Sequence, residues 1–134
     1  MEAKDLMIGD WVCYDKPNNY YTQVNEICKT NDGEESYIKC IRSQKDSNYP
    51  GIKDSFNTEI LHPIPLTPEI LEKNGWVNEH FGTQRQEWWL DKTKFPIVRY
   101  SVNDTLHHNG IVLKFVHQLQ HALKLCGIDK EIEL

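Results

Sequence analysis

A short helix with a start signal and a stop signal at residues 67–74 constrains the fold of this chain more than any other sequence feature. Thr67 stands at the N-cap, where its hydroxyl can accept a backbone N–H, and Pro68 stands at the first helical position. Gly75 follows at the position where helices stop in a left-handed residue. Two turns of helix are too short to persist alone, so the sequence predicts that this helix docks on another part of the fold.

The residues just before the helix mark a boundary. Pro63 and Pro65 favour stiff, extended backbone over residues 62–66, which predicts a connector between two modules. The expected modules are residues 1–65 and residues 66–134, with the second packed against the first.

In the first module, short β-rich segments alternate with turn residues. Val24 and Ile27 have opposite parity, so a strand that buries both must contain a bulge near Asn25 or Glu26. A few short strands cannot bury a flat face, which favours a small SH3-like β-barrel or a bent meander. An open three-stranded sheet is the alternative. The expected strands lie near residues 9–14, 20–28, 36–43 and 56–61.

In the second module, the capped helix is followed by three expected antiparallel strands and a C-terminal helix. The last helix carries one apolar stripe, and Gly127 ends it. The fold class is therefore α+β. The expected strands are residues 86–90, 97–102 and 111–116, and the expected helix is residues 117–126.

Three segments of the chain resemble a known family. They are Met7–Val12 (MIGDWV), residues 63–76 (PIPLTPEILEKNGW) and Val116–Leu123 (VHQLQHAL). Together they look like a family of small uncharacterised proteins of gut Bacteroidetes and their phages or mobile elements. The resemblance implies the order of parts given above and an accessory role in a mobile element. It implies no catalytic residue, ligand or cofactor.

Charge and cysteine content narrow the function classes. The 134 residues carry 15 Lys and Arg against 20 Asp and Glu, a net charge of -5, which disfavours nonspecific nucleic-acid binding. No apolar run suits a signal peptide or a membrane helix, so a cytoplasmic protein without membrane association is expected. The four cysteines form no C-x-x-C pair, which speaks against a zinc ribbon. Nucleotide-binding glycine loops and hydrolase nucleophile motifs are missing as well.

Two histidine pairs are the only catalytic-looking residues. His117 and His121 lie four apart on the expected helix, a spacing that can hold one metal ion, but Gln118 stands where a zincin has its glutamate. Both are expected to point into solvent, opposite the apolar stripe. His107 and His108 precede them in a layout similar to the ββα-metal nucleases.

The simpler interpretation of residues 107–110 is a polar turn in which Asn109 and Gly110 supply positive φ angles. On that interpretation the chain binds no metal and no cofactor and is not an enzyme. A metal-dependent hydrolase or nuclease that uses His107, His108, His117 and His121 is the alternative.

Aromatic side chains are the remaining candidate binding residues. Trp88 and Trp89 are neighbours in an expected strand, so they point to opposite faces, and one of them is expected to be exposed on a partner-binding surface. Nearby cations favour an acidic peptide or a single-stranded nucleic acid. We therefore expect a non-enzymatic binding or accessory module for a protein or single-stranded nucleic acid, with a homo-oligomer as a further alternative. The candidate binding residues are Trp11, Tyr14, Tyr37, Arg85, Trp88, Trp89, Lys92 and Lys94.

Overall fold

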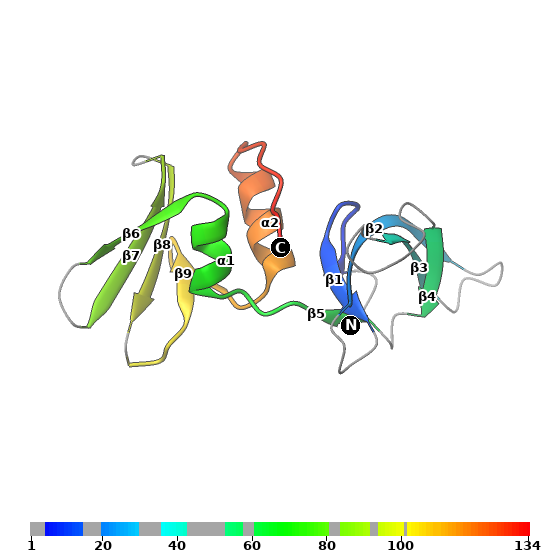
Figure 1. Cartoon of the computed structure of the whole chain (residues 1–134), viewed down its shortest axis with the longest axis horizontal. Coiled ribbons are helices and arrows are strands. Elements are labelled where there is room, and N and C mark those ends of the chain that lie inside the picture. Colours follow the sequence, from blue (N-terminus) through cyan, green and yellow to red (C-terminus); the bar gives the residue numbers. More distant parts are fainter. Residues whose placement is uncertain are drawn as a thin grey trace. The chain divides into compact units, whose positions relative to one another are not determined.

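The structure is a computed structural model that describes residues 5–14, 20–29, 36–42, 53–57, 61–80, 84–91, 94–100 and 102–134. Within these ranges the chain is α+β, with two helices and two antiparallel sheets (Figure 1). The chain divides into two compact units, Met1–Ile64 and Pro65–Leu134, and each unit carries one of the sheets. No helix in the described ranges is long and apolar enough to span a lipid bilayer.

The first unit holds five strands in the order β4-β3-β2-β1-β5. β1 to β4 form an antiparallel meander, and β5 returns to pair with β1. In the described part of the unit, no pairing joins β4 to β5, so the sheet is open and the closed form of the expected barrel is not seen. The strands are β1 (Trp11–Tyr14), β2 (Tyr20–Lys29), β3 (Ser36–Arg42), β4 (Lys53–Asn57) and β5 (Leu61–Pro63).

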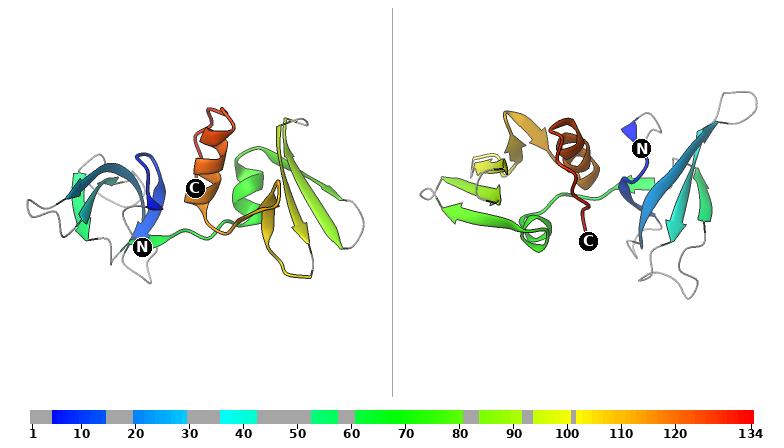
Figure 2. Two further views of the ribbon diagram at one scale, coloured as in Figure 1. Left: turned by 180° about the vertical axis from the view of Figure 1, so that it is seen from behind. Right: turned by 90° about the horizontal axis from the view of Figure 1, so that it is seen from above.

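The long strand β2 contains the bulge expected from the sequence. Its register against β3 shifts between Val24 and Glu26, which confirms the predicted position. Val24 is buried, but Ile27 is 40% exposed, so the expectation that both side chains are buried was wrong. A bulge bends a strand and increases its twist, and β2 is curved along its length (Figure 2).

The proline-marked stretch is only in part a connector. Leu61 pairs with Tyr14 and Pro63 with Val12, so residues 61–63 form an edge strand of the first sheet. Proline has no backbone N–H to donate. It is tolerated in an edge strand because no further strand lies beside that strand to need the donor. The single strand expected over residues 56–61 is therefore wrong. In its place stand β4 and β5, and residues 58–60 lie outside the described residues.

A tight turn places the start of β1. Gly9 has a φ of 94°, a conformation that favours glycine, and its N–H donates to the carbonyl of Val24 at 2.7 Å. The fully buried Asp10 accepts a hydrogen bond from the backbone N–H of Met7 at 2.7 Å. These bonds explain physically why a Gly-Asp pair precedes the first strand.

The second unit begins with helix α1 (Pro68–Lys73), and its capping residues act as predicted. The hydroxyl of Thr67 accepts a hydrogen bond from the N–H of Ile70 at 3.3 Å. Gly75, just after the C-cap residue Asn74, has a φ of 95°. Leu71 is fully buried, so the short helix is docked as expected.

The second sheet has five strands, in the order β10-β9-β8-β7-β6, where the sequence predicted three. β6 and β9 were not expected, because β6 starts directly after the helix stop and β9 is only three residues long. The expected strand over residues 111–116 is also too long, since it ends at Leu113. The strands are β6 (Trp76–His80), β7 (Arg85–Leu90), β8 (Lys94–Tyr100), β9 (Leu106–His108) and β10 (Ile111–Leu113).

A two-residue turn joins β9 to β10. Asn109 and Gly110 have φ angles of 49° and 79°, so the positive φ angles expected from the sequence are confirmed. Helix α2 (Val116–Leu125) follows, one residue earlier than expected at each end. The side-chain oxygen of Gln118 accepts the backbone N–H groups of Lys114 and Phe115, at 2.8 and 3.1 Å, and so caps the start of α2.

Both helices lie on one side of the second sheet (Figures 1 and 2). Side chains from α1, α2 and the sheet form the core of the unit. Polar groups of two core tryptophans have partners: the indole N–H of Trp76 donates to the carbonyl of Phe95 at 3.1 Å, and that of Trp88 donates to Glu72 at 3.5 Å. The buried apolar residues are Leu66, Leu71, Trp76, Trp88, Leu90, Phe95, Ile97, Leu106, Leu113, Val116, Leu119, Leu123 and Ile132.

The last residues of the chain are bound to the end of α1. The buried side chain of Asn74 donates to the carbonyl of Glu133 at 2.8 Å and accepts the N–H of the same residue at 2.7 Å. Its amide also donates to the carbonyl of Ile70 at 2.8 Å. Ile132 is 2% exposed. The tail therefore belongs to the folded unit.

We expect Asn74→Ala to lower the free energy of unfolding of the second unit by about 1–2 kcal/mol, because it removes these three hydrogen bonds and leaves the backbone of Glu133 without them. Urea denaturation followed by circular dichroism measures the loss. Limited proteolysis should remove the tail of the Asn74→Ala variant faster than the tail of the unmodified protein. Equal stability and equal cleavage in both proteins would mean that Asn74 does not anchor the tail.

Candidate functional site

The second sheet has one face under the helices and one face without them. Strand register and alternation assign each side chain to a face: Trp88 lies opposite Asn78 and Ile97 on the helix side, whereas Trp89 lies opposite Val77 on the other side. Val77 is 63% exposed and Tyr100 is 43% exposed. We call this surface the open face. Its residues are Val77, Glu79, Arg85, Glu87, Trp89, Val98, Tyr100, His107 and Val112.

Polar and aromatic side chains form an ordered row on the open face. The guanidinium group of Arg85 lies 3.3 Å from the carboxylate of Glu87 and 6.0 Å from the ring centroid of Tyr100. The rings of Tyr100 and His107 meet edge to face at 6.0 Å. Thr105 forms a hydrogen bond of 2.6 Å with Nε2 of His107. These contacts restrict the rotamers of Arg85, Tyr100 and His107.

The two adjacent tryptophans face opposite sides of the sheet, as strand alternation predicts, but neither is as exposed as expected for a binding residue. Trp88 is 1% exposed and belongs to the core. Trp89 is partly exposed and lies at the bulge in the pairing of β7 with β8. Of the two, only Trp89 can be reached by a partner.

The other candidate residues do not join this surface. Trp11 and Tyr14 belong to the first unit, where both are partly buried and Tyr14 packs on the core cluster around Val12. The side chain of Tyr37, in β3, and the whole of Lys92 lie outside the described residues. Lys94 lines a pocket rather than the open face. Arg85 and Trp89 are therefore the candidate residues that the described structure brings onto one surface.

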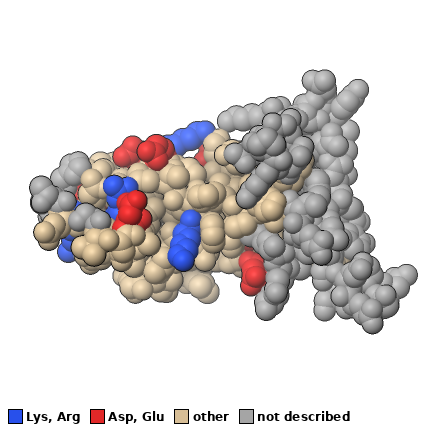
Figure 3. Space-filling model, turned by 90° about the horizontal axis from the view of Figure 1, so that it is seen from below, with Lys and Arg blue, Asp and Glu red and all other residues tan. Residues whose placement is uncertain are grey.

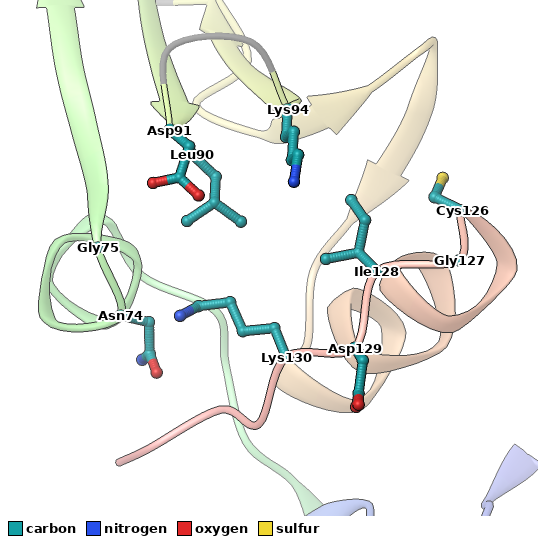
Figure 4. A pocket seen from close by; sticks show the side chains of 10 residues that line it. All are labelled: Asn74, Gly75, Leu90, Asp91, Lys94, Cys126, Gly127, Ile128, Asp129 and Lys130. Atoms are coloured by element: carbon teal, nitrogen blue, oxygen red, sulfur yellow. The ribbon is translucent and has the colours of Figure 1, made fainter.

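That pocket, with a volume of about 670 Å³, is a second candidate site in the same unit, and the sequence did not indicate it. Three segments distant in sequence line it: the end of α1, the turn after β7 and the tail that follows α2 (Figure 4). The side chains of Lys94 and Lys130 extend into it from different walls (Figure 4). The lining residues are Asn74, Gly75, Leu90, Asp91, Lys94, Cys126, Gly127, Ile128, Asp129 and Lys130.

The helix histidines are not both turned to solvent. His117 is 6% exposed, and its ring stacks on that of Phe115 with centroids 5.8 Å apart, so the expectation of a solvent-facing side chain was wrong. Stacking on the residue just before the helix draws the ring out of water. His121 is partly exposed and meets His117 edge to face at 5.6 Å.

The other two histidines face opposite sides of β9. His107 lies on the open face, whereas His108 is 7% exposed on the helix side. Among the described residues, no group of three or more His, Cys, Asp or Glu side chains is arranged to hold a metal ion. That the chain binds no metal remains a prediction.

Charge is not concentrated in the described part of the surface that Figure 3 shows. Acidic and basic side chains are interspersed there among uncharged ones (Figure 3). On the open face, Arg85 is paired with Glu87, and Glu79 adds a second carboxylate. Such a balance of charge is more typical of a protein-binding surface than of a surface that binds a phosphate backbone.

Comparison of this chain with protein-family models, with curated proteins and with solved structures finds no match. The geometry of the second unit is therefore the basis for a functional assignment.

Proposed function

We propose that the chain is a non-enzymatic binding module whose second unit docks a protein partner on the open face. The observation that carries this proposal is a sheet face that neither helix covers, with exposed Val77 opposite the partly exposed Trp89 at one end of β7 and exposed Tyr100 opposite Arg85 at the other. Glu87, which is 8% exposed, lies between the two ends. Contiguous apolar patches on otherwise polar proteins commonly mark interaction surfaces. Aromatic anchors flanked by an arginine supply much of the binding energy in such surfaces.

A protein is favoured over a single-stranded nucleic acid because of the kinds of side chains present. Val77, Val98 and Val112 provide aliphatic contact area that suits a protein side chain better than a stacked base. The only described cation on the open face, Arg85, is already paired with Glu87. In the described part of the open face, docking of nucleic acid therefore lacks the free positive charge that it requires.

An enzyme is a weaker proposal. A hydrolase built on His107, His108, His117 and His121 needs imidazoles that converge on one ion. His107 and His108 project from opposite faces of one strand, which separates them.

We also propose that the first unit is an open, bent variant of the SH3-like fold. Its strand order, with β5 beside β1 and a long bulged β2 between β1 and β3, supports this assignment. We keep two proposals from the sequence analysis: a cytoplasmic location, from the missing apolar run, and a mobile-element role, from the family resemblance.

The docking proposal predicts that Trp89 dominates binding. Peptides selected from a random display library on the unmodified protein should bind Trp89→Ala at least about tenfold more weakly, because a central aromatic anchor is lost. Isothermal titration calorimetry measures both dissociation constants. Leu125→Ala is the matched control, since Leu125 is 89% exposed on α2 and should leave binding unchanged.

Two results would contradict the proposal. One is a set of selected peptides whose affinity is the same for the unmodified protein and for Trp89→Ala. The other is tight, strongly salt-dependent binding of oligo-dT or oligo-U with no selectable peptide, which would assign the open face to nucleic acid instead.

A further inference from the structure

Cys126 and His108 form a pair at one end of the pocket in the second unit. Cys126, the C-cap residue of α2, is exposed and lines the pocket, whereas His108 is 7% exposed. The Sγ atom of Cys126 lies 4.0 Å from Nε2 of His108. A solvent-accessible thiol therefore faces a nearly buried imidazole.

Each ring nitrogen of His108 faces a different partner. Its Nδ1 lies 2.8 Å from the carbonyl oxygen of Pro96, and because a carbonyl only accepts, Nδ1 carries the proton and donates it. In the neutral ring this leaves Nε2 as an acceptor directed at the thiol. The ring also stacks on Phe95, with centroids 3.6 Å apart and an interplanar angle of 5°. A nucleophile, a base and a group that orients the base are thus present together.

The position of Cys126 makes this base important. The C-terminal end of a helix presents carbonyl groups rather than N–H groups to a nearby sulfur atom. Cys126 stands at that end of α2, so the helix does not activate it. Transfer of the thiol proton to His108 is therefore the route by which Cys126 becomes nucleophilic.

Two lysines and two aspartates line the adjoining pocket, which therefore suits a small ligand that carries ammonium groups as well as carboxylates, as glutathione disulfide does. Lys94 and Lys130 extend into it, and Nζ of Lys130 lies 5.9 Å from the ring centroid of Trp76, which restrains that side chain (Figure 4). Leu90 and Ile128 provide apolar contact between the lysines. A volume of about 670 Å³ lies in the range of small-ligand sites. A ligand that reaches Cys126 can place its carboxylates at the lysines.

We propose that Cys126 is a thiol–disulfide exchange site for small anionic disulfides of the glutathione disulfide type. The thiol proton passes to Nε2 of His108, and Sγ attacks one sulfur of the ligand. A new S–S bond forms as the ligand's S–S bond breaks, and the departing thiolate takes the proton from His108. The sulfur of Cys126 is oxidised to a mixed disulfide, and the other half of the ligand is reduced to a free thiol. This site is independent of docking on the open face.

The test measures the rate of glutathionylation at each cysteine of the full chain. The reduced protein is mixed with oxidised glutathione at pH 7, quenched at intervals, digested and analysed by mass spectrometry. Cys126 should react faster in the folded protein than in the same protein unfolded in urea, with Cys13 and Cys28 as internal references. His108→Gln, with folding checked by circular dichroism, should lower the rate at Cys126 by about tenfold because the base is lost.

A second arm tests the choice of ligand. The double variant Lys94→Met/Lys130→Met should react about threefold more slowly with oxidised glutathione but equally fast with the neutral hydroxyethyl disulfide. Lys114→Met, which changes an exposed lysine outside the pocket, should behave like the unmodified protein.

Two results would overturn the proposal. If folded Cys126 reacts no faster than unfolded Cys126, or if a folded His108→Gln keeps the full rate, His108 does not activate the thiol. If the lysine variant loses the same rate with both disulfides, or loses none, the pocket does not select the anionic ligand.

Discussion

Replacing Trp88 by alanine should lower the free energy of unfolding of the second unit by about 3–5 kcal/mol, the largest effect expected for this chain. Trp88 is 1% exposed and lies opposite Ile97, which is fully buried. Its indole N–H also donates to Glu72 of α1, so the ring joins the sheet to the helix. The substitution leaves a large cavity and removes this bond.

Trp89→Ala is the matched control, because it removes the same side chain from the next residue of the same strand. Trp89 is partly exposed on the open face, so the expected loss is below about 1.5 kcal/mol. Urea denaturation monitored by far-ultraviolet circular dichroism measures both variants. Equal losses would mean that the sheet buries both rings, and the open face would then not be a contact surface.

Leu71→Ala should lower the free energy of unfolding by about 2–4 kcal/mol, the second largest effect, whereas Thr67→Ala should cost only about 1 kcal/mol. Leu71 is fully buried, so its truncation leaves a cavity in the core. The hydroxyl of Thr67 accepts a single capping hydrogen bond of 3.3 Å from the N–H of Ile70.

Thermal and urea denaturation of both variants test this pair. Lys73→Ala, an exposed change in the same helix, should shift the free energy by less than about 0.5 kcal/mol. A neutral Leu71→Ala would show that α1 contributes little to the core. The ranking of Leu71 above Thr67 would then be wrong.

Features that depend on a few consecutive residues were predicted well. The cap at Thr67, the stop at Gly75 and the positive φ angles at Asn109 and Gly110 were each predicted at the right residue. The bulge beside Val24 was also predicted at the right position, although Ile27 is not buried as that prediction assumed. The cap, the stop and the turn are decided by backbone sterics and by hydrogen bonds that span four residues or fewer.

Features that depend on pairing between segments were predicted less well. β9 is too short to show a pattern, and β6 starts directly after the helix stop at Gly75, with no loop between helix and strand. Pro63 suggested a connector, yet it ends a strand because β1 lies alongside to pair with it. His117 was expected in solvent because helical periodicity does not include the stacked ring of Phe115.

The candidate sites show the same division. Alternation of Trp88 and Trp89 predicted that one ring would be exposed, but which one depends on the side of the sheet that the helices cover. No sequence spacing indicated the pocket, the pair of Cys126 with His108, or the bond between Asn74 and the tail. Asn74 and Glu133 are 59 residues apart, and Cys126 and His108 are 18 apart.

The sequence by itself therefore determined where α1 is capped and stopped and where β9 turns into β10, because those choices are settled within a few residues of backbone. The tertiary structure alone decided which face of the second sheet stays open and which side chains meet in the pocket. Those outcomes depend on the burial of apolar surface from distant segments, chiefly Leu71, Trp88 and Leu119, which is non-directional and summed over the whole unit. The open face and the Cys126–His108 pair are consequences of that packing.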